Sequence, residues 1–235
     1  MNQLLLLSPE EAALRRGNLQ SLMRAKGLDA MLVCDNANLF YLSGRVFAGY
    51  AYIPAEGDAV WLVRRPVELT GSNVCYIHKP ENIPDVLLSQ GLAAPDVLGL
   101  EFDIASYSMV TRLMGVFDGS RFENANGILR AARSVKTAVE LSMLRESGVK
   151  HVEVYRHIPA LYEPGMTDHE LQVGIERVSR IEGCLGVFRI SGQSMELFMG
   201  SVLTGKNADE PTPYDFAMGG AGLSPTLPVG ACGEE

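Results

Sequence analysis

The sequence predicts an α/β fold built in two parts, and three observations lead to this prediction. A capped helical pattern over residues 8–27 runs directly into a short stretch, residues 30–34, that is apolar on both faces. Strand and helix patterns then alternate up to about residue 130, as they do when helices cover a sheet. A second series of helical patterns begins near Arg133. We therefore expect a mixed-sheet domain over residues 1–131 and a second domain over residues 132–235.

The first helix has clear signals at both ends. Ser8 stands at the N-cap, Pro9 at the first helical position and Glu11 three residues after Ser8, which is the pattern of a capping box. Gly27 provides the stop. The apolar positions that recur at helical spacing between them are Leu14, Leu19, Leu22 and Met23.

The rest of the first part keeps the α/β order. Residues 50–53 and 60–63 flank the turn-forming residues 54–58 and predict a β-hairpin. Further strands are expected at residues 74–78 and 97–102, and helices at residues 83–90 and 106–117. Together these elements predict one compact unit around a mixed sheet.

The second part opens with a long helix over residues 138–161, which Pro159 is expected to kink or end. Thr167 is predicted to cap the next helix, with Glu170 as its capping-box partner and Gly183 as its stop. Strands are expected at residues 187–190 and 197–203.

Composition excludes several classes of protein. The chain has 235 residues, of which 47% are hydrophobic and 20% charged, so it can form a core. Its net charge of −8 argues against broad nucleic-acid binding, which needs a basic surface. No apolar run reaches the length of about 18 residues that a transmembrane helix needs. The four leucines at residues 4–7 are too few for a secretory signal, and we expect a cytoplasmic protein without a membrane partner.

The polar residues present do not assemble a complete active site in the sequence. The four cysteines form no CxxC pair and are expected to be reduced, buried thiols. His151 and His157 are six residues apart, and metal-binding histidine pairs favour three or four. Residues 200–207 nearly match a phosphate-binding loop, but Asn207 replaces its final hydroxyl and Pro211 follows where a helix should begin. We therefore expect no catalytic residue and no metal ligand within this chain.

The segment over residues 216–233 is unusual because it contains no charged residue. Disordered loops are normally polar and charged, so this uncharged segment does not have the composition of a disordered loop. We expect this segment to pack against a part of the protein that this chain does not contain.

Three stretches resemble the creatinase/prolidase/aminopeptidase P family, the pita-bread metallopeptidases. The first runs from Leu19-x-x-Leu22-Met23 through Gly27-Leu28-Asp29-Ala30 to Asn38-x-x-Tyr41-Leu42-Ser43-Gly44. The second is Arg133-Ser134-Val135-Lys136-Thr137-x-x-Glu140-Leu141-x-x-Leu144-Arg145. The third combines Pro164-Gly165-Met166-Thr167-Asp168-x-Glu170-Leu171 with Gly205-x-Asn207-Ala208.

The resemblance implies a creatinase-type N-terminal domain followed by the incomplete first part of an α+β pita-bread domain. In that family two divalent metal ions (Mn, Co or Zn) share Asp, Asp, His, Glu and Glu ligands, and a bridging hydroxide attacks the scissile carbonyl of an Xaa-Pro bond. It also implies a peptide substrate with proline at its second position and a homodimer in the complete protein.

Two departures from the family pattern bear on the site. The strand that carries the first metal-binding aspartates comes after Glu235 in the family's order, so none of the ligands is placed here. The family usually has a histidine five residues after the asparagine that corresponds to Asn207, and here that position is Thr212. Either substrate is bound differently or the register slips near Pro211. The resemblance makes Thr212 and Tyr214 the candidate substrate-binding residues.

The sequence therefore predicts the N-terminal portion of a metal-dependent Xaa-Pro aminopeptidase- or dipeptidase-like hydrolase, inactive as this chain alone. The first alternative is a non-catalytic relative that binds proteins or peptides, because a fold does not dictate its function. The second is a related hydrolase that acts on a C–N bond outside peptides.

Overall fold

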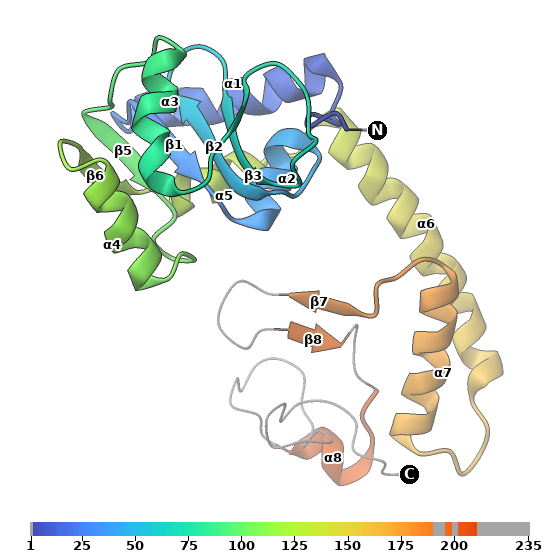
Figure 1. Cartoon of the computed structure of the whole chain (residues 1–235). Coiled ribbons are helices and arrows are strands. Elements are labelled where there is room, and N and C mark those ends of the chain that lie inside the picture. Colours follow the sequence, from blue (N-terminus) through green and yellow to red (C-terminus); the bar gives the residue numbers. More distant parts are fainter. Residues whose placement is uncertain (1, 190–195, 199–201, 211–235) are drawn as a thin grey trace. The chain divides into compact units, whose positions relative to one another are not determined.

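The structure is a computed structural model, and it describes residues 2–189, 196–198 and 202–210 (Figure 1). The chain divides into two compact units, Met1–Val139 (unit 1) and Glu140–Glu235 (unit 2). The domain boundary between residues 131 and 132 stays a prediction. Each unit is described by itself.

Unit 1 is built on a six-stranded sheet with the order β4-β3-β2-β1-β5-β6. β1 pairs antiparallel with β2 and parallel with β5, so the predicted mixed sheet is confirmed. β2 and β3 form the predicted hairpin. The strands are β1 (Ala30–Val33), β2 (Ala48–Pro54), β3 (Val60–Arg65), β4 (Val74–Tyr76), β5 (Val97–Leu100) and β6 (Arg121–Asn124).

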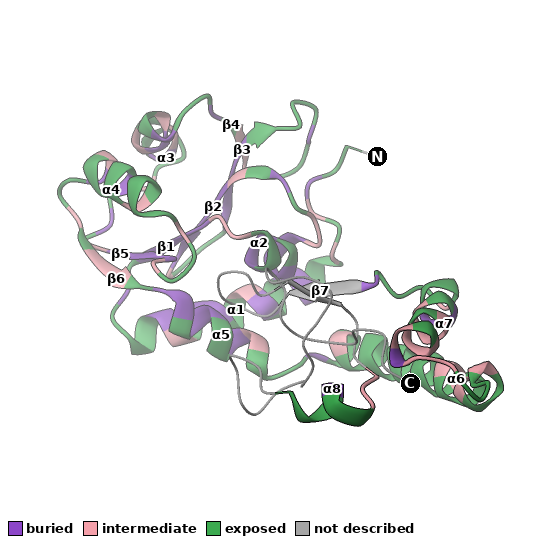
Figure 2. Ribbon diagram, turned by 90° about the horizontal axis from the view of Figure 1, so that it is seen from below, coloured by how far each residue is buried: buried purple, intermediate pink, exposed green. Residues whose placement is uncertain are grey.

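Helices cover both faces of this sheet (Figures 1 and 2). Residues of α1 (Pro9–Ala25), α2 (Asn36–Ser43) and α5 (Asn126–Ser134) pack in the hydrophobic cluster on one face. Residues of α3 (Ile83–Ser89), which follows a short 3-10 turn, and of α4 (Tyr107–Val116) pack in the cluster on the other. Unit 1 is therefore a three-layer α/β/α domain.

The central strand β1 has apolar residues at every position and does not alternate between apolar and polar residues. Met31 and Val33 belong to one hydrophobic cluster, whereas Ala30 and Leu32 belong to the other. All four are buried, because each face of the sheet carries its own layer of helices. A strand covered on both faces reads as a continuous apolar run.

The ends of α1 are partly as predicted. The Ser8 hydroxyl accepts a hydrogen bond from the backbone N–H of Glu11 at 3.2 Å, and Gly27 adopts a left-handed φ of 68° just after the helix. The predicted capping box is wrong in its second half. The Glu11 carboxylate hydrogen-bonds to Arg15 and Thr137 instead, because it is buried against one partner in the same helix and one from a distant segment.

Three elements of unit 1 were not expected from the sequence. α2 begins where the Asp35 carboxylate accepts hydrogen bonds from the backbone N–H groups of Ala37 and Asn38, and it ends at the left-handed Gly44. β6 and α5 complete the sheet edge and its covering layer. β6 has the sequence Arg-Phe-Glu-Asn, which carries little strand signal because it lies at an edge.

The described elements of unit 2 are α7 (Asp168–Ile181), β7 (Val187–Arg189), β8 (Glu196–Phe198) and α8 (Gly205–Asp209), together with most of α6 (Ala138–Leu161). α6 passes through Pro159 and ends two residues later, so the helix does not stop at the proline. Thr167 and Glu170 form the predicted capping box of α7. β7 and β8 pair antiparallel, and Val202 and Leu203, predicted as strand, are not in β8.

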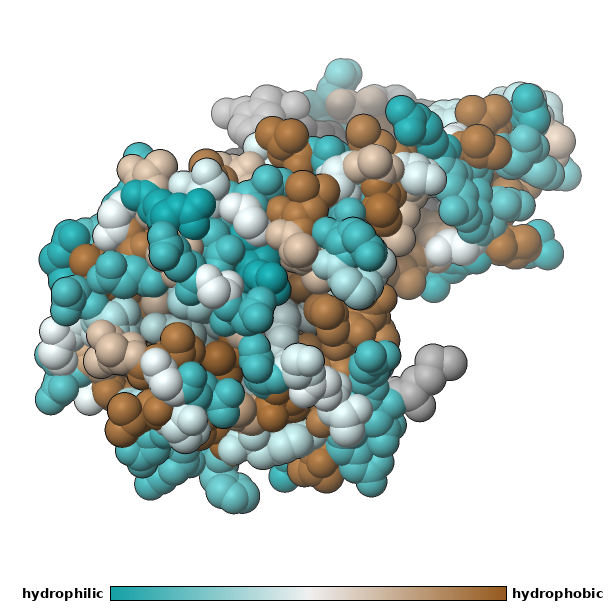
Figure 3. Space-filling view, turned by 90° about the horizontal axis from the view of Figure 1, so that it is seen from above, coloured by the Kyte–Doolittle hydropathy of each residue, from teal (hydrophilic) through white to brown (hydrophobic). Residues whose placement is uncertain are grey.

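The α6 helix is exposed along its length. None of its residues is buried, and its predicted apolar positions all remain accessible (Figure 2). These accessible apolar residues are Leu141, Leu144, Val149, Val152 and Tyr155. Apolar and polar side chains also mix over the face of the molecule that Figure 3 shows.

Gly49 is required by the close approach of β2 and β3. A Cβ atom at this position would lie 2.1 Å from the carbonyl oxygen of Leu62, at a point where the strand register shifts.

We predict that Gly49→Ala lowers the free energy of unfolding by more than about 1 kcal/mol, because the backbone must move. Gly17→Ala is the matched control. It meets no atom within 4 Å in α1 and should stabilise by roughly 0.5–1 kcal/mol. Urea unfolding measures both, and equal stabilities of the two variants would contradict this account of Gly49.

Candidate functional site

A buried side chain, Glu101, joins four elements of unit 1. Its carboxyl oxygens accept hydrogen bonds from the backbone N–H groups of Cys34 at 2.6 Å and Asp35 at 2.8 Å, just after β1. They also accept from Nδ2 of Asn38 in α2 at 2.6 Å. Oδ1 of Asn38 in turn accepts from Nη1 of Arg133 in α5 at 2.9 Å. We call these five residues the Glu101 cluster.

A second buried group lies between α1, α2 and the start of α6. Oε1 of Glu11 accepts from Nε of Arg15 at 2.7 Å and from the hydroxyl of Thr137 at 2.6 Å. Nη1 of Arg15 donates to the carbonyl of Tyr41 at 2.9 Å, and its guanidinium carbon lies 4.9 Å from the centre of the Tyr41 ring. The Tyr41 hydroxyl donates to the carbonyl of Ala132 at 3.2 Å. Glu11, Arg15, Tyr41 and Thr137 form what we call the Glu11 cluster.

The two clusters give a structural role to residues that carry the family resemblance. Asn38 and Tyr41 come from the first stretch, and Arg133 and Thr137 from the second. The fold brings these stretches together through the hydrogen bond between the side chains of Arg133 and Asn38, which are 95 residues apart in the sequence. Spacing alone did not reveal this contact, since Asn38 lies on α2 and Arg133 on α5. The clusters therefore position the elements of unit 1 rather than perform chemistry.

The Glu11 cluster also shifts a pKa. Burial raises the pKa of the Glu11 carboxyl, but the hydrogen bonds from Thr137 and Arg15 and the charge of Arg15 outweigh it. The net effect is a pKa below the ordinary value of 4.5. The carboxylate form is therefore the one that the fold stabilises.

In unit 2 the structure brings together the two halves of the third stretch. Nδ2 of Asn207 in α8 donates to Oδ2 of Asp168 in α7 at 2.8 Å. The two side chains belong to residues that are only 3% and 2% exposed. The sequence had singled out both residues, but not their contact.

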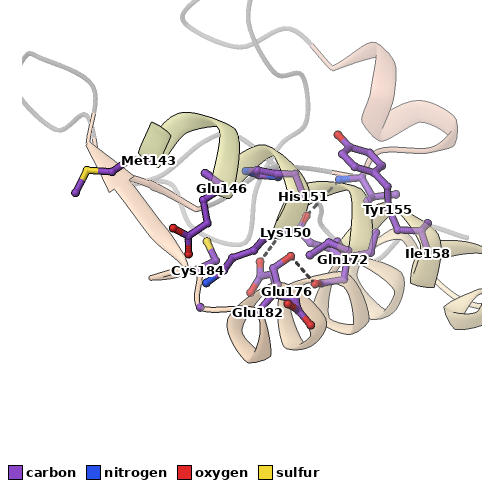
Figure 4. A pocket seen from close by; sticks show the side chains of 16 residues that line it. Met143, Glu146, Lys150, His151, Tyr155, Ile158, Gln172, Glu176, Glu182 and Cys184 are labelled. Atoms are coloured by element: carbon purple, nitrogen blue, oxygen red, sulfur yellow. Dashed lines mark hydrogen bonds between the residues drawn. The ribbon is translucent and has the colours of Figure 1, made fainter. Parts of the chain in front are cut away.

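A cavity of unit 2 lies between α6 and α7 and measures about 610 Å³ (Figure 4). Its lining mixes charges with apolar residues. Lys150 and His151 come from α6, while Gln172 and Glu176 come from α7 and are joined by a hydrogen bond of 3.0 Å. Cys184 lies near its edge. These groups do not converge on a recognisable set of catalytic partners.

Among the described residues, no group of three or more His, Cys, Asp or Glu side chains is placed to hold a metal ion. The described part of the chain therefore does not fit the dinuclear site that the resemblance implies. The thiol of Cys34 is mostly buried, and burial beside the Glu101 and Asp35 carboxyls raises its pKa, which makes it a poor nucleophile. The candidate substrate-binding residues Thr212 and Tyr214 lie outside the described residues, as does the uncharged segment over residues 216–233.

Comparison with known proteins identifies the family. The model of the creatinase/prolidase N-terminal domain family matches residues 15–135, which is about half of the chain and lies entirely in unit 1. The chain therefore belongs to the creatinase/prolidase N-terminal domain family. No described helix is both long and apolar enough to cross a membrane.

Individual relatives share the fold at low sequence identity. The chain is 25% identical to the ectoine hydrolase of Halomonas elongata. The matched region covers 86% of this chain and 57% of the ectoine hydrolase. It resembles the Xaa-Pro dipeptidase of Bacillus anthracis with a TM-score of 0.64 and 21% identity, covering 74% of this chain and 50% of that one. It also resembles the dipeptidase PepE of Mycobacterium ulcerans with a TM-score of 0.61 and 22% identity, covering 78% of this chain and 53% of that one. The chain thus spans about half the length of the relatives that it matches.

The hydrogen bond from Thr137 to Glu11 gives a direct test of the Glu11 cluster. We predict that Thr137→Val lowers the free energy of unfolding by about 1–3 kcal/mol at pH 7, because it leaves a buried carboxylate short of a donor. Thr137→Ser keeps the hydroxyl and is the matched control, with a smaller loss. Urea unfolding of the chain measures both. Equal stabilities of the valine and serine variants would show that the bond contributes nothing.

The same pair predicts a pH dependence. Because the pKa of Glu11 is lower in the folded state, its stabilisation is present above pH 4.5, the ordinary value, and is lost as pH falls through the folded pKa. The difference in unfolding free energy between the wild type and Thr137→Val should therefore shrink below pH 4.5. A difference that grows towards acid pH would contradict the lowered pKa.

Proposed function

We propose that this chain is the N-terminal portion of a metal-dependent hydrolase that cleaves Xaa-Pro peptides. The observation that carries the proposal is that the shared fold extends past the N-terminal domain. The family match ends at residue 135, whereas the likeness to the Xaa-Pro dipeptidase covers 74% of the chain. The likeness therefore takes in part of unit 2 as well, where the third stretch lies.

In this proposal unit 1 organises the protein and the second domain completes the site. The Glu101 and Glu11 clusters stabilise unit 1 up to Thr137, just before α6. Thr212 and Tyr214 contact the peptide, and a threonine hydroxyl can hydrogen-bond to substrate but cannot carry a proton at neutral pH. The two divalent metal ions (Mn, Co or Zn) would be held by residues outside the described part of this chain and would supply an activated water. The complete protein is a cytoplasmic homodimer in this proposal.

The test is an assay of the complete protein, as its source cell makes it, with Ala-Pro and Ala-Ala dipeptides. After removal of metal with a chelator and addition of Mn²⁺, Co²⁺ or Zn²⁺, we predict cleavage of Ala-Pro at least about tenfold faster than Ala-Ala. The chelated protein should be inactive. The 235-residue chain, assayed in parallel, should cleave neither dipeptide with any of the metals. Equal cleavage of both dipeptides, or activity that survives chelation, would contradict the proposal.

A second candidate function rests on the match to an ectoine hydrolase, which extends over 86% of this chain. Hydrolysis of ectoine should therefore be assayed beside the dipeptides under the same metal conditions. Turnover of ectoine without turnover of Ala-Pro would favour this second function. Tight binding of an Xaa-Pro peptide with no cleavage would favour the non-catalytic binding module.

A further inference from the structure

A cavity of unit 1 plays no part in the proposed function. It lies among the N-terminal segment, α1, the strands β2 and β3 and the loop before β4, and it measures about 390 Å³. Small-molecule sites occupy about 300–1,000 Å³, so this volume can hold a ligand. Protein interiors are close-packed and keep few voids larger than a water molecule. The cavity is therefore a candidate binding site.

The buried walls of this cavity are apolar. Leu4, Leu42 and Ile53 line it and are 0%, 3% and 0% exposed. Trp61 also lines it and is 7% exposed, and its ring meets that of Phe47 edge-on with the centroids 6.3 Å apart. Water finds few hydrogen-bond partners between such walls. An occupant that brings an apolar group is therefore favoured over water.

The wall formed by the N-terminal segment is held in place by backbone hydrogen bonds. The N–H of Leu4 donates to the carbonyl of Thr70 at 2.8 Å. The N–H of Thr70 donates back to the carbonyl of Asn2 at 2.6 Å. The N–H of Leu6 donates to the carbonyl of Ser43 at 2.8 Å. The cavity is therefore preformed, as ligand sites usually are.

Two opposite charges line the same cavity. Nη2 of Arg16 lies 2.9 Å from Oδ1 of Asp58, and the two side chains are 29% and 70% exposed. Their exposure places this ion pair where the cavity meets solvent. An exposed ion pair contributes little to stability, and a guanidinium has five N–H donors while a carboxylate has two oxygens. The pair can therefore take up one anionic and one cationic group that lie close together.

We propose that this cavity binds a free α-amino acid with an apolar side chain. Arg16 binds its carboxylate, Asp58 binds its ammonium group, and its side chain fills the apolar space beside Trp61. An α-amino acid fits because both of its charged groups are attached to one carbon atom, as close together as the ion pair requires. A dipeptide separates the same two charges and fits poorly. The inference does not depend on the proposed function, since every lining residue lies in unit 1.

Trp61 is the only tryptophan of the chain, so its fluorescence reports directly on the cavity. When L-leucine is titrated into the 235-residue chain, we expect a saturable change in emission with a Kd of about 1 mM or lower. 4-Methylpentanoate lacks the ammonium group, isopentylamine lacks the carboxylate, and glycine lacks the apolar side chain. Each should bind at least about tenfold more weakly than L-leucine, because each loses one of the proposed interactions.

Two variants test the charged groups. Arg16→Gln and Asp58→Asn each remove one charge and should weaken the binding of L-leucine at least about tenfold. The matched controls are Arg24→Gln in α1 and Glu56→Gln in the turn between β2 and β3, because these exposed residues do not line the cavity. Both controls should bind L-leucine within about twofold of the wild type. Urea unfolding checks that each variant is folded.

The inference is overturned if L-leucine up to about 10 mM changes neither the emission nor the heat measured by titration calorimetry. Equal affinities for L-leucine and 4-methylpentanoate would reject the paired charges, as would unchanged binding by the folded Arg16→Gln and Asp58→Asn variants. A Leu-Gly dipeptide that binds as tightly as L-leucine would reject a free amino acid as the ligand. All of these readouts measure binding alone and are independent of Xaa-Pro cleavage.

Discussion

The buried carboxyl group of Glu101 is the constraint on which the architecture of unit 1 depends. The turn from β1 into α2 leaves partly buried backbone N–H groups at Cys34 and Asp35 that need hydrogen-bond acceptors. Glu101, at the end of the neighbouring strand β5, accepts from two of them and from the side chain of Asn38. Asn38 then binds Arg133 in α5. One side chain thus ties the parallel strand pair at the centre of the sheet to two of the helices that cover it.

Much of the fold could be predicted because local signals and tertiary contacts agree. Ser8 caps α1, Thr167 and Glu170 cap α7, and the apolar run at residues 30–33 forms the central strand. Prediction failed where a tertiary partner decided the outcome. The Glu11 side chain leaves its expected capping position for Arg15, four residues on in the same helix, and for Thr137. Thr137 is 126 residues away, and no local pattern reveals it.

The shorter elements were missed for a different reason. α2 has only eight residues, and its stability comes from Asp35 at one end and Gly44 at the other rather than from an apolar stripe. For the site, the sequence singled out Asp168 and Asn207 through the resemblance. Their contact needed the structure, because 39 residues separate them. Two residues chosen by motif therefore proved to be buried hydrogen-bond partners within unit 2.

The central claim is that buried polar contacts, above all those of Glu101, hold the elements of unit 1 together. It is tested most directly by the unfolding free energy of Glu101→Gln in urea, beside the exposed control Glu56→Gln. An amide at position 101 replaces one acceptor oxygen with a donor group facing existing donors, so we predict a loss of at least about 2 kcal/mol. The control should stay within about 0.5 kcal/mol of the wild type. A Glu101→Gln protein as stable as the control would contradict the account.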